Sequence, residues 1–338
     1  MKNTTLEVKN VIENSDKAIF EKNNDVHYLQ SLSWCKFRDD CFWASTYRED
    51  RCVASSIIRM KTLPIGLGGI CYIERGPIGE SLNDIISHIE EVINYLSNSN
   101  ALLVMISPMM YDIEEIATIS NALKSSGWVE QKDTLNLYKN TLVIDLRNSI
   151  EEIKSKFRRS LKTQINKSNK LGIDVDFESD ASSICEFISF YNVVAKDRGI
   201  MPIDDETSKF IYEAISNGEA QIIIARLNGI FLGGIVLIKQ GKRIIYEWGM
   251  TTQDPEYKSL PLAHKIHWEA INWAKNNGFE IYDFGGYWLQ RGNDDPINYF
   301  KLGFTKVTET VTPEYNYVLK PLRTKLYKIL TKLRKYFK

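Results

Sequence analysis

The residue types that most often act as nucleophiles, proton carriers or metal ligands are few in this sequence. It has 4 histidines and 5 cysteines, and no two cysteines form a C-x-x-C pair. His264 and His267 are three residues apart but have no carboxylate or cysteine partner at ligand spacing, so we expect no metal site. No Ser/His/Asp or Cys/His set is present to suggest covalent catalysis. We interpret the cysteines as reduced thiols.

Basic residues are concentrated in one segment of the second half. Seven of them crowd a single helix predicted there: Lys154, Lys156, Arg158, Arg159, Lys162, Lys167 and Lys170. A solvated helix face and a contact with nucleic acid or phosphate explain this pattern equally well.

The C-terminal segment, residues 315–338, has eight basic residues and no acidic one. Its apolar residues follow helical spacing: Leu322, Leu326, Ile329, Leu330, Leu333 and Phe337. This pattern predicts a basic amphipathic helix, which suits an anionic membrane surface. The alternative is a helix that docks back on the first half of the chain. Both can hold if the apolar stripe docks near the root of the helix and its tip stays free.

Composition limits the class of protein. The 338 residues include 43 Lys and Arg and 43 Asp and Glu, and 43% of them are hydrophobic. Zero net charge argues against a protein that coats nucleic acid, and the hydrophobic content excludes a disordered chain. Because the C-terminal segment carries +8, the residues before it carry −8. The apolar run at 101–110 is too short to span a membrane, and residues 1–16 lack an apolar signal core, so we expect a cytoplasmic protein.

Both halves of the chain repeat one order of elements. Each has three predicted strands, a helix and a further strand. In the first half these are 42–47, 52–60, 70–74, 82–96 and 101–106. In the second half they are 220–227, 231–239, 243–250, a helix from Pro261 to Asn277, and 281–284. Turn and stop signals such as Asn228-Gly229 and Asn277-Gly278 set these limits.

This repeat predicts an α/β (mixed α+β) fold with two tandem units, each with a mixed, mainly antiparallel sheet. We place the first unit at 1–146 and the second at 147–312. Ser149 and Glu152 have the spacing of a capping box, which would open the first helix of the second unit. Residues 313–338 would form the C-terminal basic helix.

The element order is that of the GNAT acyltransferase fold, and two tandem copies resemble the Fem family (FemABX-like). Its members are non-ribosomal peptidyltransferases, which add amino acids from aminoacyl-tRNA to the stem peptide of the peptidoglycan precursor. The phrases that carry the resemblance follow the family's order along nearly the whole chain: 33–37 (SWCKF), 74–77 (ERGP), 141–146 (TLVIDL), 246–249 (YEWG), 268–271 (WEAI), 282–286 (YDFGG) and 300–304 (FKLGF).

The resemblance implies roles for three cations in a cleft between the two units. Lys36 and Arg198 would bind phosphates of a nucleotide- or lipid-linked cell-envelope precursor, and Lys301 would be central to transfer. A cation beside an activated ester stabilises the oxyanion that forms when a neutral amine attacks it. The alternative for Lys36 and Lys301 is a surface lysine whose stem lies on neighbouring aromatic rings.

Aromatic residues complete the implied site. Tyr246 and Trp248 would line the transfer channel, and strand alternation predicts that they share one face while Glu247 points away. Further residues of the matched phrases are candidates for substrate binding: Phe300, Arg75 and Asp283. The resemblance also implies charged tRNA as the donor and no cofactor. The basic C-terminal segment favours a lipid-linked acceptor and a peripheral location at the inner face of the bacterial membrane.

Two departures from the family pattern leave the acceptor and donor open. The family often has an Asp-Pro pair near the acceptor where this chain has Ser107-Pro108, and Asp112 is a possible substitute. Residues 150–180 are too few for the coiled-coil insertion of some members. One alternative is an acyl-CoA-dependent N-acyltransferase acting on an envelope sugar or amino acid, although loop 257–263 lacks the glycines of a pyrophosphate-binding loop. The other is a catalytically silent scaffold.

Overall fold

The computed structural model describes residues 4–9, 19, 25–131 and 138–336. The chain forms two compact units, of which unit 1 comprises residues 1–139 and 310–338 and unit 2 comprises residues 140–309. The division falls at Asn140 rather than after residue 146. The reason is that strand β8 (Asn140–Asp145) pairs with β13 (Ile281–Gly286), which lies within unit 2.

Unit 1 is built around an eight-stranded sheet in the order β1-β2-β3-β4-β6-β15-β7, with β5 paired to β3. The strands are β1 (Thr4–Lys9), β2 (Cys41–Arg48), β3 (Arg51–Leu63), β4 (Gly68–Arg75), β5 (Ile78–Gly79), β6 (Ala101–Pro108), β7 (Val129–Glu130) and β15 (Tyr315–Val318). Strands β2, β3 and β4 form an antiparallel meander, whereas β4 and β6 run parallel.

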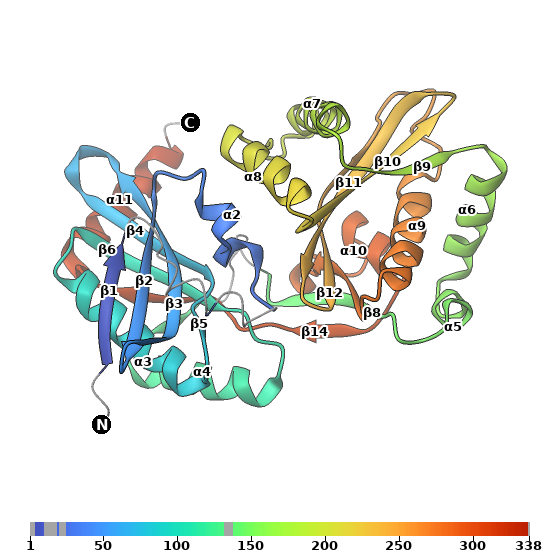
Figure 1. Ribbon diagram of the computed structural model, residues 1–338. Coiled ribbons are helices and arrows are strands. Elements are labelled where there is room, and N and C mark those ends of the chain that lie inside the picture. Colours follow the sequence, from blue (N-terminus) through green and yellow to red (C-terminus); the bar gives the residue numbers. More distant parts are fainter. Residues whose placement is uncertain (1–3, 10–18, 20–24, 132–137, 337–338) are drawn as a thin grey trace. The chain divides into compact units, whose positions relative to one another are not determined.

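Helices lie on both faces of this sheet (Figure 1). They are η1 (Tyr28–Gln30), α2 (Leu32–Cys35), η2 (Pro64–Gly66), α3 (Leu82–Ser97), α4 (Ile113–Ser125) and α11 (Pro321–Tyr336). Side chains of β6 alternate between the two faces. Val104 joins the core beneath α3 and α4, whereas Leu103 joins a second cluster that includes Tyr327 of α11. Therefore α11 covers the face opposite to α3 and α4.

Unit 2 is built around a seven-stranded sheet in the order β14-β8-β13-β12-β11-β10-β9. Besides β8 and β13, its strands are β9 (Asp174–Glu178), β10 (Ala220–Leu227), β11 (Ile230–Gln240), β12 (Arg243–Thr251) and β14 (Thr308–Thr310). Its helices are α5 (Ile150–Ser155), α6 (Arg159–Lys170), α7 (Ala181–Arg198), α8 (Asp205–Ser216), α9 (Leu262–Asn276), η3 (Leu289–Arg291) and α10 (Pro296–Lys301).

The two sheet faces of unit 2 have different helix layers (Figure 1). Ile235 and Leu237 of β11 lie in the core with Ile266 of α9. Gly234 precedes Ile235 and therefore points to the other face, where a Cβ added to it would lie 3.1 Å from the ring of Phe187 of α7. Therefore α9 covers one face, and α7 covers the other.

The predicted tandem fold is confirmed. In each unit a three-strand antiparallel meander is followed by a helix and then by a strand parallel to the last meander strand: β4 with β6, and β12 with β13. The capping box of Ser149 and Glu152 also forms, at the start of α5.

The single helix predicted across the basic segment is wrong. Two short helices, α5 and α6, are separated at Phe157 and Arg158. Phe157 is 3% exposed and its ring packs edge-on against Trp268 and Phe304. The backbone N–H of Arg158 donates to Gly303 O at 2.9 Å. Burial of the Phe157 ring and this tertiary hydrogen bond interrupt the helix.

The C-terminal helix is present, but the predicted docking of its apolar stripe near the root is wrong. Leu322, in the first turn, is 85% exposed, and the stripe continues exposed through Leu326, Ile329 and Leu330. The side that meets unit 1 contains Thr324, which is 4% exposed and whose hydroxyl donates to Leu102 O at 3.2 Å. The side chains of Leu333 and Phe337 lie outside the described residues.

Within the described part of the chain, no helix combines the length and the apolar character needed to cross a bilayer. The five cysteines all carry free thiols.

A buried ionic network joins four strands of unit 2, namely β8, β12, β13 and β14. Asp283 of β13 is fully buried, and its carboxylate accepts hydrogen bonds from the hydroxyl of Thr141 (β8), from Gly285 N at 2.8 Å and from Arg243 Nη1 (β12) at 2.8 Å. Arg243 Nη2 also donates to Glu309 Oε2 at 2.6 Å.

We predict that Asp283→Ala lowers the free energy of unfolding by about 3 kcal/mol, since removing one partner leaves the buried Arg243 charge poorly compensated. Denaturant unfolding monitored by circular dichroism measures this. Asp145→Ala, which breaks an exposed pair with Arg147, is the matched control, with an expected change of less than about 1 kcal/mol. Equal losses in the two variants would contradict the structural role of the network.

Candidate active site

The candidate site of unit 2 lies where β12 and β13 stop pairing. These parallel strands pair only from Arg243 with Ile281 to Ile245 with Asp283. Beyond that point the register of β12 with β11 shifts by one residue, and the register of β13 with β8 is irregular between Asp283 and Gly286. Backbone groups and side chains at this point are therefore released from the regular sheet.

The irregularity in β12 is a bulge at Glu247, and it corrects one prediction. Leu237 pairs with Tyr246 and Val236 pairs with Trp248, so the two aromatic residues lie on opposite faces of the sheet. The ring of Tyr246 contacts His267 of α9, with ring centroids 4.6 Å apart. Trp248 instead contacts Phe210 of α8, at 6.3 Å. The strand alternation assumed from the sequence fails because the bulge inserts one residue.

Lys301 lies against this irregular region. It is the last residue of α10 and is 7% exposed. Its Nζ donates a hydrogen bond to Gly286 O at 2.7 Å and lies 6.0 Å from the centre of the Tyr246 ring. A buried ammonium with one backbone acceptor retains N–H groups that can donate to a substrate.

Burial lowers the pKa of Lys301 to about 8, although the negative charges of Asp283 and Glu247 act in the opposite direction. Lys301 is therefore mainly protonated at neutral pH but loses its proton more readily than an ordinary lysine. The proximity of Glu247 was not expected from strand alternation and follows from the same bulge. A group with a pKa near the working pH is typical of active sites.

Tyr246 is held in place by small and aromatic neighbours. A Cβ added at Gly249 would lie 2.6 Å from the Tyr246 ring, so glycine at that position leaves room for the ring. Burial raises the pKa of the Tyr246 phenol, which keeps it neutral.

Phe300 packs with the two histidines of α9, its ring centroid 5.3 Å from each. His267 is 1% exposed, and its Nδ1 forms a hydrogen bond with the Tyr282 hydroxyl at 2.7 Å. Burial lowers the pKa of His267 to about 3, so its ring is neutral. His264 and His267 are therefore parts of an aromatic core. Among the described residues no cluster of His, Cys, Asp and Glu has the form of a metal site.

Two further predicted cations, Arg198 and Lys36, are exposed. Arg198 is the last residue of α7, and its Nη1 lies 3.8 Å from Met250 Sδ of β12. Lys36 follows α2 in unit 1, and its ammonium lies 5.4 Å from the ring centre of Phe37. Both are accessible to a phosphate, and the roles of both stay predictions.

Arg75 is a buried cation at the end of β4. It is 1% exposed, stacks on the Tyr138 ring at 4.4 Å and donates from Nη2 to Tyr138 O at 3.2 Å. Its Nε and Nη1 have no hydrogen-bond partner in the described part of the chain. An arginine buried with unpaired N–H groups is costly unless an anion or water meets them.

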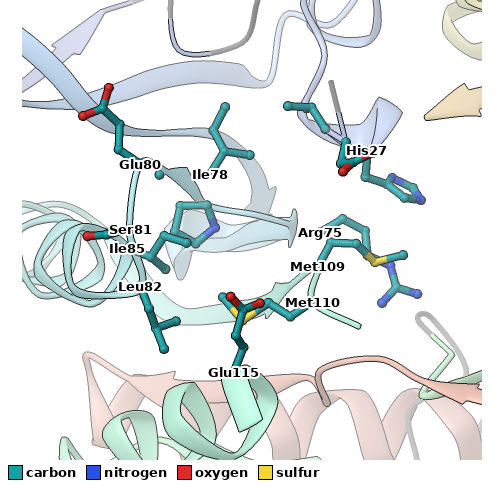
Figure 2. A pocket seen from close by; sticks show the side chains of 14 residues that line it. His27, Arg75, Ile78, Glu80, Ser81, Leu82, Ile85, Met109, Met110 and Glu115 are labelled. Atoms are coloured by element: carbon teal, nitrogen blue, oxygen red, sulfur yellow. The ribbon is translucent and has the colours of Figure 1, made fainter. Parts of the chain in front are cut away.

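A pocket of about 290 Å³ lies beside Arg75 in unit 1 (Figure 2). Its apolar wall includes Leu82, Met109 and Met110, and Figure 2 shows Glu115 reaching toward it from α4. The remaining ionisable residues that line it are Asp25, His27 and Glu80. Three carboxylates against one arginine do not favour a pyrophosphate in this pocket.

Glu314 of unit 1 is a further candidate residue that no sequence pattern indicated. Because Tyr315 pairs with Ile106 in antiparallel register, Glu314 lies next to Ser107, and Ser107 pairs with Glu74 on the other side. Within the described residues neither Ser107 Oγ nor Glu314 Oε1 has a hydrogen-bond partner. Burial, and then the charge of Glu74, raise the pKa of Glu314 to about 7.

Asp112, which the sequence suggested as the carboxylate near Ser107, caps a helix instead. It is the N-cap of α4, and its Oδ1 accepts hydrogen bonds from the backbone N–H groups of Glu114 and Glu115. No sequence signal identified Glu314, because it reaches Ser107 only through the return of the C-terminal strand to the first sheet.

Several known proteins resemble this chain in sequence or in fold. Residues 155–301 match a family described as "Acetyltransferase (GNAT) domain". The UDP-N-acetylmuramoylpentapeptide-lysine N(6)-alanyltransferase of Weissella viridescens is 22% identical over 297 residues, covering 82% of this chain and 84% of that protein. The lipid II:glycine glycyltransferase of Staphylococcus saprophyticus is 19% identical, covering 97% and 96%. The crystal structure of FemX superposes with a TM-score of 0.78 at 15% identity, covering 96% of this chain and 99% of that one.

The tandem fold and the match to the GNAT domain define an acyltransferase of the GNAT fold. Within that class the chain is similar along most of its length to the alanyl- and glycyltransferases named above, and it shares its fold with FemX.

We predict that the natural protein gains stability relative to Lys301→Met by about 3 kcal/mol between pH 8 and pH 10.5. Below pH 8 Lys301 is protonated in both states and the folded state bears the full penalty of burying the charge. Above pH 8 the folded state releases this proton while the unfolded chain, with a pKa near 10.4, keeps it, so the penalty disappears with rising pH. Urea unfolding at several pH values measures the difference.

Lys301→Gln serves as a second reference, because it also lacks the charge but keeps a polar end. We expect the stability of the natural protein to rise with pH by the same amount relative to either variant. A difference that stays constant across this pH range would show that the Lys301 ammonium is not penalised by burial.

Proposed function

We propose that this protein transfers an aminoacyl group from aminoacyl-tRNA to an amine of a nucleotide- or lipid-linked peptidoglycan-type precursor. The observation that carries the proposal is the buried Lys301 at the divergence of β12 and β13, with its Nζ bound to Gly286 O. The relatives named as alanyl- and glycyltransferases support the kind of group transferred.

In the proposed reaction a neutral acceptor amine attacks the carbonyl carbon of the aminoacyl ester. The tetrahedral oxyanion receives hydrogen bonds from the Lys301 ammonium, which remains protonated throughout. The new amide C–N bond forms, the ester C–O bond breaks, and the proton lost by the amine ends on the released ribose hydroxyl. No cofactor is required, because the ester is already activated.

Cations of both units have proposed roles in substrate binding. Lys36 and Arg198 would bind phosphates of the acceptor. Arg75, whose Nε–H and Nη1–H groups have no partner among the described residues, would donate them to a neutral oxygen of the acceptor. The exposed basic residues of α6, including Lys167 and Lys170, would contact the tRNA backbone. Asp283 would act indirectly, by holding the strand that carries Gly286, while Phe300 and Tyr246 would line the donor site.

One observation favours the alternative, an acyl-CoA-dependent N-acyltransferase. The N-cap of α9 is Pro261, and although the N–H of Leu262 donates to Leu260 O, no side chain caps the following N–H groups of Ala263 and His264, which could meet an anion such as pyrophosphate. In unit 1 the equivalent helix α3 is capped by Ser81 and has Asp84 in its first turn, which disfavours an anion there.

A donor panel tests the proposed function. Purified protein is incubated with an amine acceptor and either charged tRNA or acetyl-CoA, and product is measured by mass spectrometry. We expect product from charged tRNA, and a loss of at least about 100-fold in rate for Lys301→Met, as for other oxyanion donors. Lys301→Arg should retain more activity because it keeps the charge.

Product from acetyl-CoA alone would favour the alternative. Normal turnover by Lys301→Met would remove the assignment of the site. Absence of product with every donor, in a protein that unfolds cooperatively, would favour a silent scaffold.

We further propose that Glu314, with Ser107, binds an amine of the acceptor in unit 1. The pKa of Glu314, about 7, and that of Lys301, about 8, then predict a bell-shaped dependence of kcat/KM on pH. The rate rises as Glu314 becomes ionised and falls as Lys301 loses its proton. Glu314→Gln should lose the acid limb and Lys301→Arg the alkaline limb.

Asp112→Asn is the matched control for Glu314→Gln, since both convert a carboxylate of unit 1 to an amide. The control should keep the acid limb unchanged. An acid limb that persists in Glu314→Gln would assign the ionisation to another group.

A further inference from the structure

The C-terminal helix α11 presents an apolar stripe away from the protein. Each residue of an α-helix is rotated by about 100° from the one before it, so sequence spacing decides on which side of the helix a side chain lies. Leu322, Leu326, Ile329 and Leu330 fall within one sector and are 85%, 46%, 47% and 37% exposed. Isolated exposed leucines are ordinary, but four on one stripe form a continuous apolar surface.

The opposite sector of α11 attaches the helix to unit 1. Thr324 is buried there with its hydroxyl on Leu102 O, and Tyr327 packs against the cluster of Leu63, Ile70, Leu102 and Leu103. Lys320, just before the helix, donates from Nζ to Ser97 O at 2.8 Å. The orientation of the stripe is therefore set by contacts with the folded unit and does not depend on the stripe itself.

Positive charge flanks the stripe. Arg323 lies on one side of it and Lys325 on the other, with Lys328 further around, and all three are exposed. The whole segment 315–338 has eight basic residues and no acidic one. An apolar stripe between rows of cations fits the boundary between anionic headgroups and acyl chains.

We propose that α11 binds the surface of an anionic lipid bilayer, with the stripe of Leu322, Leu326, Ile329 and Leu330 inserted among the lipids. A second copy of this chain is a poorer occupant. Pairing two such stripes about a two-fold axis would bring their flanking cations together, whereas anionic headgroups neutralise them. The proposal deepens the proposed function, because a bilayer-bound enzyme meets a lipid-linked acceptor, but its evidence is the helix alone.

Flotation of the full-length protein with vesicles tests the proposal. We expect binding to phosphatidylglycerol-rich vesicles and little binding to pure phosphatidylcholine. Lys325→Glu with Lys328→Glu should lower the partition coefficient at least about 30-fold, since each basic residue near the surface contributes about a factor of five. Leu326→Ser with Ile329→Ser should lower it about tenfold or more.

The matched control is Lys167→Glu with Lys170→Glu, which changes the net charge equally but on α6. It should float as well as the natural protein. An equal loss of vesicle binding in this control would show that general charge attraction, and not the surface of α11, causes the binding. That result would overturn the proposal. Truncation before β15 is unsuitable, because β15 pairs with β6 and β7 in the sheet of unit 1.

Two further measurements separate the remaining outcomes. Light scattering without lipid should give the same mass for the natural protein and for the Leu326→Ser, Ile329→Ser variant. If the natural protein is an oligomer that this variant dissociates, a second copy of the chain covers the stripe and the membrane proposal is wrong. Transfer to a soluble, nucleotide-linked acceptor should be unchanged in the α11 variants. Failure of flotation with normal transfer would overturn the membrane proposal and leave the proposed function standing.

Discussion

The position of Lys301 in unit 2 depends on the hydrogen bonds and the ion pair that the buried carboxylate of Asp283 forms. It is fully buried and binds Arg243 of the neighbouring parallel strand, Thr141 of the antiparallel strand and the N–H of Gly285 two residues ahead. The last bond turns the backbone of β13 at Gly285, which has a positive φ of 66°. The next carbonyl, that of Gly286, is thereby placed to receive Lys301. A buried ion pair is weak evidence for stability, but it is good evidence for a specified backbone path.

Each unit contains an ionisable group whose pKa is shifted toward neutral pH, and the two pKa shifts have opposite directions. In unit 2, burial destabilises the charged form of a lysine despite nearby carboxylates, and the Lys301 pKa falls. In unit 1, burial and Glu74 destabilise the charged form of a carboxyl group despite Arg75 and Lys139, and the Glu314 pKa rises. In both cases desolvation exceeds the attraction of opposite charges, so each group gains and loses its proton within the physiological range.

The elements of the fold were predictable from sequence, because hydrophobic alternation and turn residues act locally. Strands β10 and β12 and helices α3 and α9 lie within a residue or two of their predicted limits. Tertiary contacts decided what the sequence could not. The bulge at Glu247 reversed the face of Trp248, and burial of Phe157 divided the basic helix. Lys301 was identified through a resemblance to a family, whereas Glu314 depends on a strand pairing between distant segments and left no local pattern.

The C-terminal helix shows why an amphipathic pattern alone does not fix orientation. An apolar stripe on a surface helix normally packs on the protein, because burial removes apolar area from water. In α11 the contact is made by Thr324 and Tyr327, which satisfy the Leu102 carbonyl and fill the edge of a small cluster. This attachment leaves the apolar stripe facing outward among basic residues. The zero net charge of the chain is thus an average over an acidic body and a basic segment, and it conceals a molecule with one cationic, apolar surface.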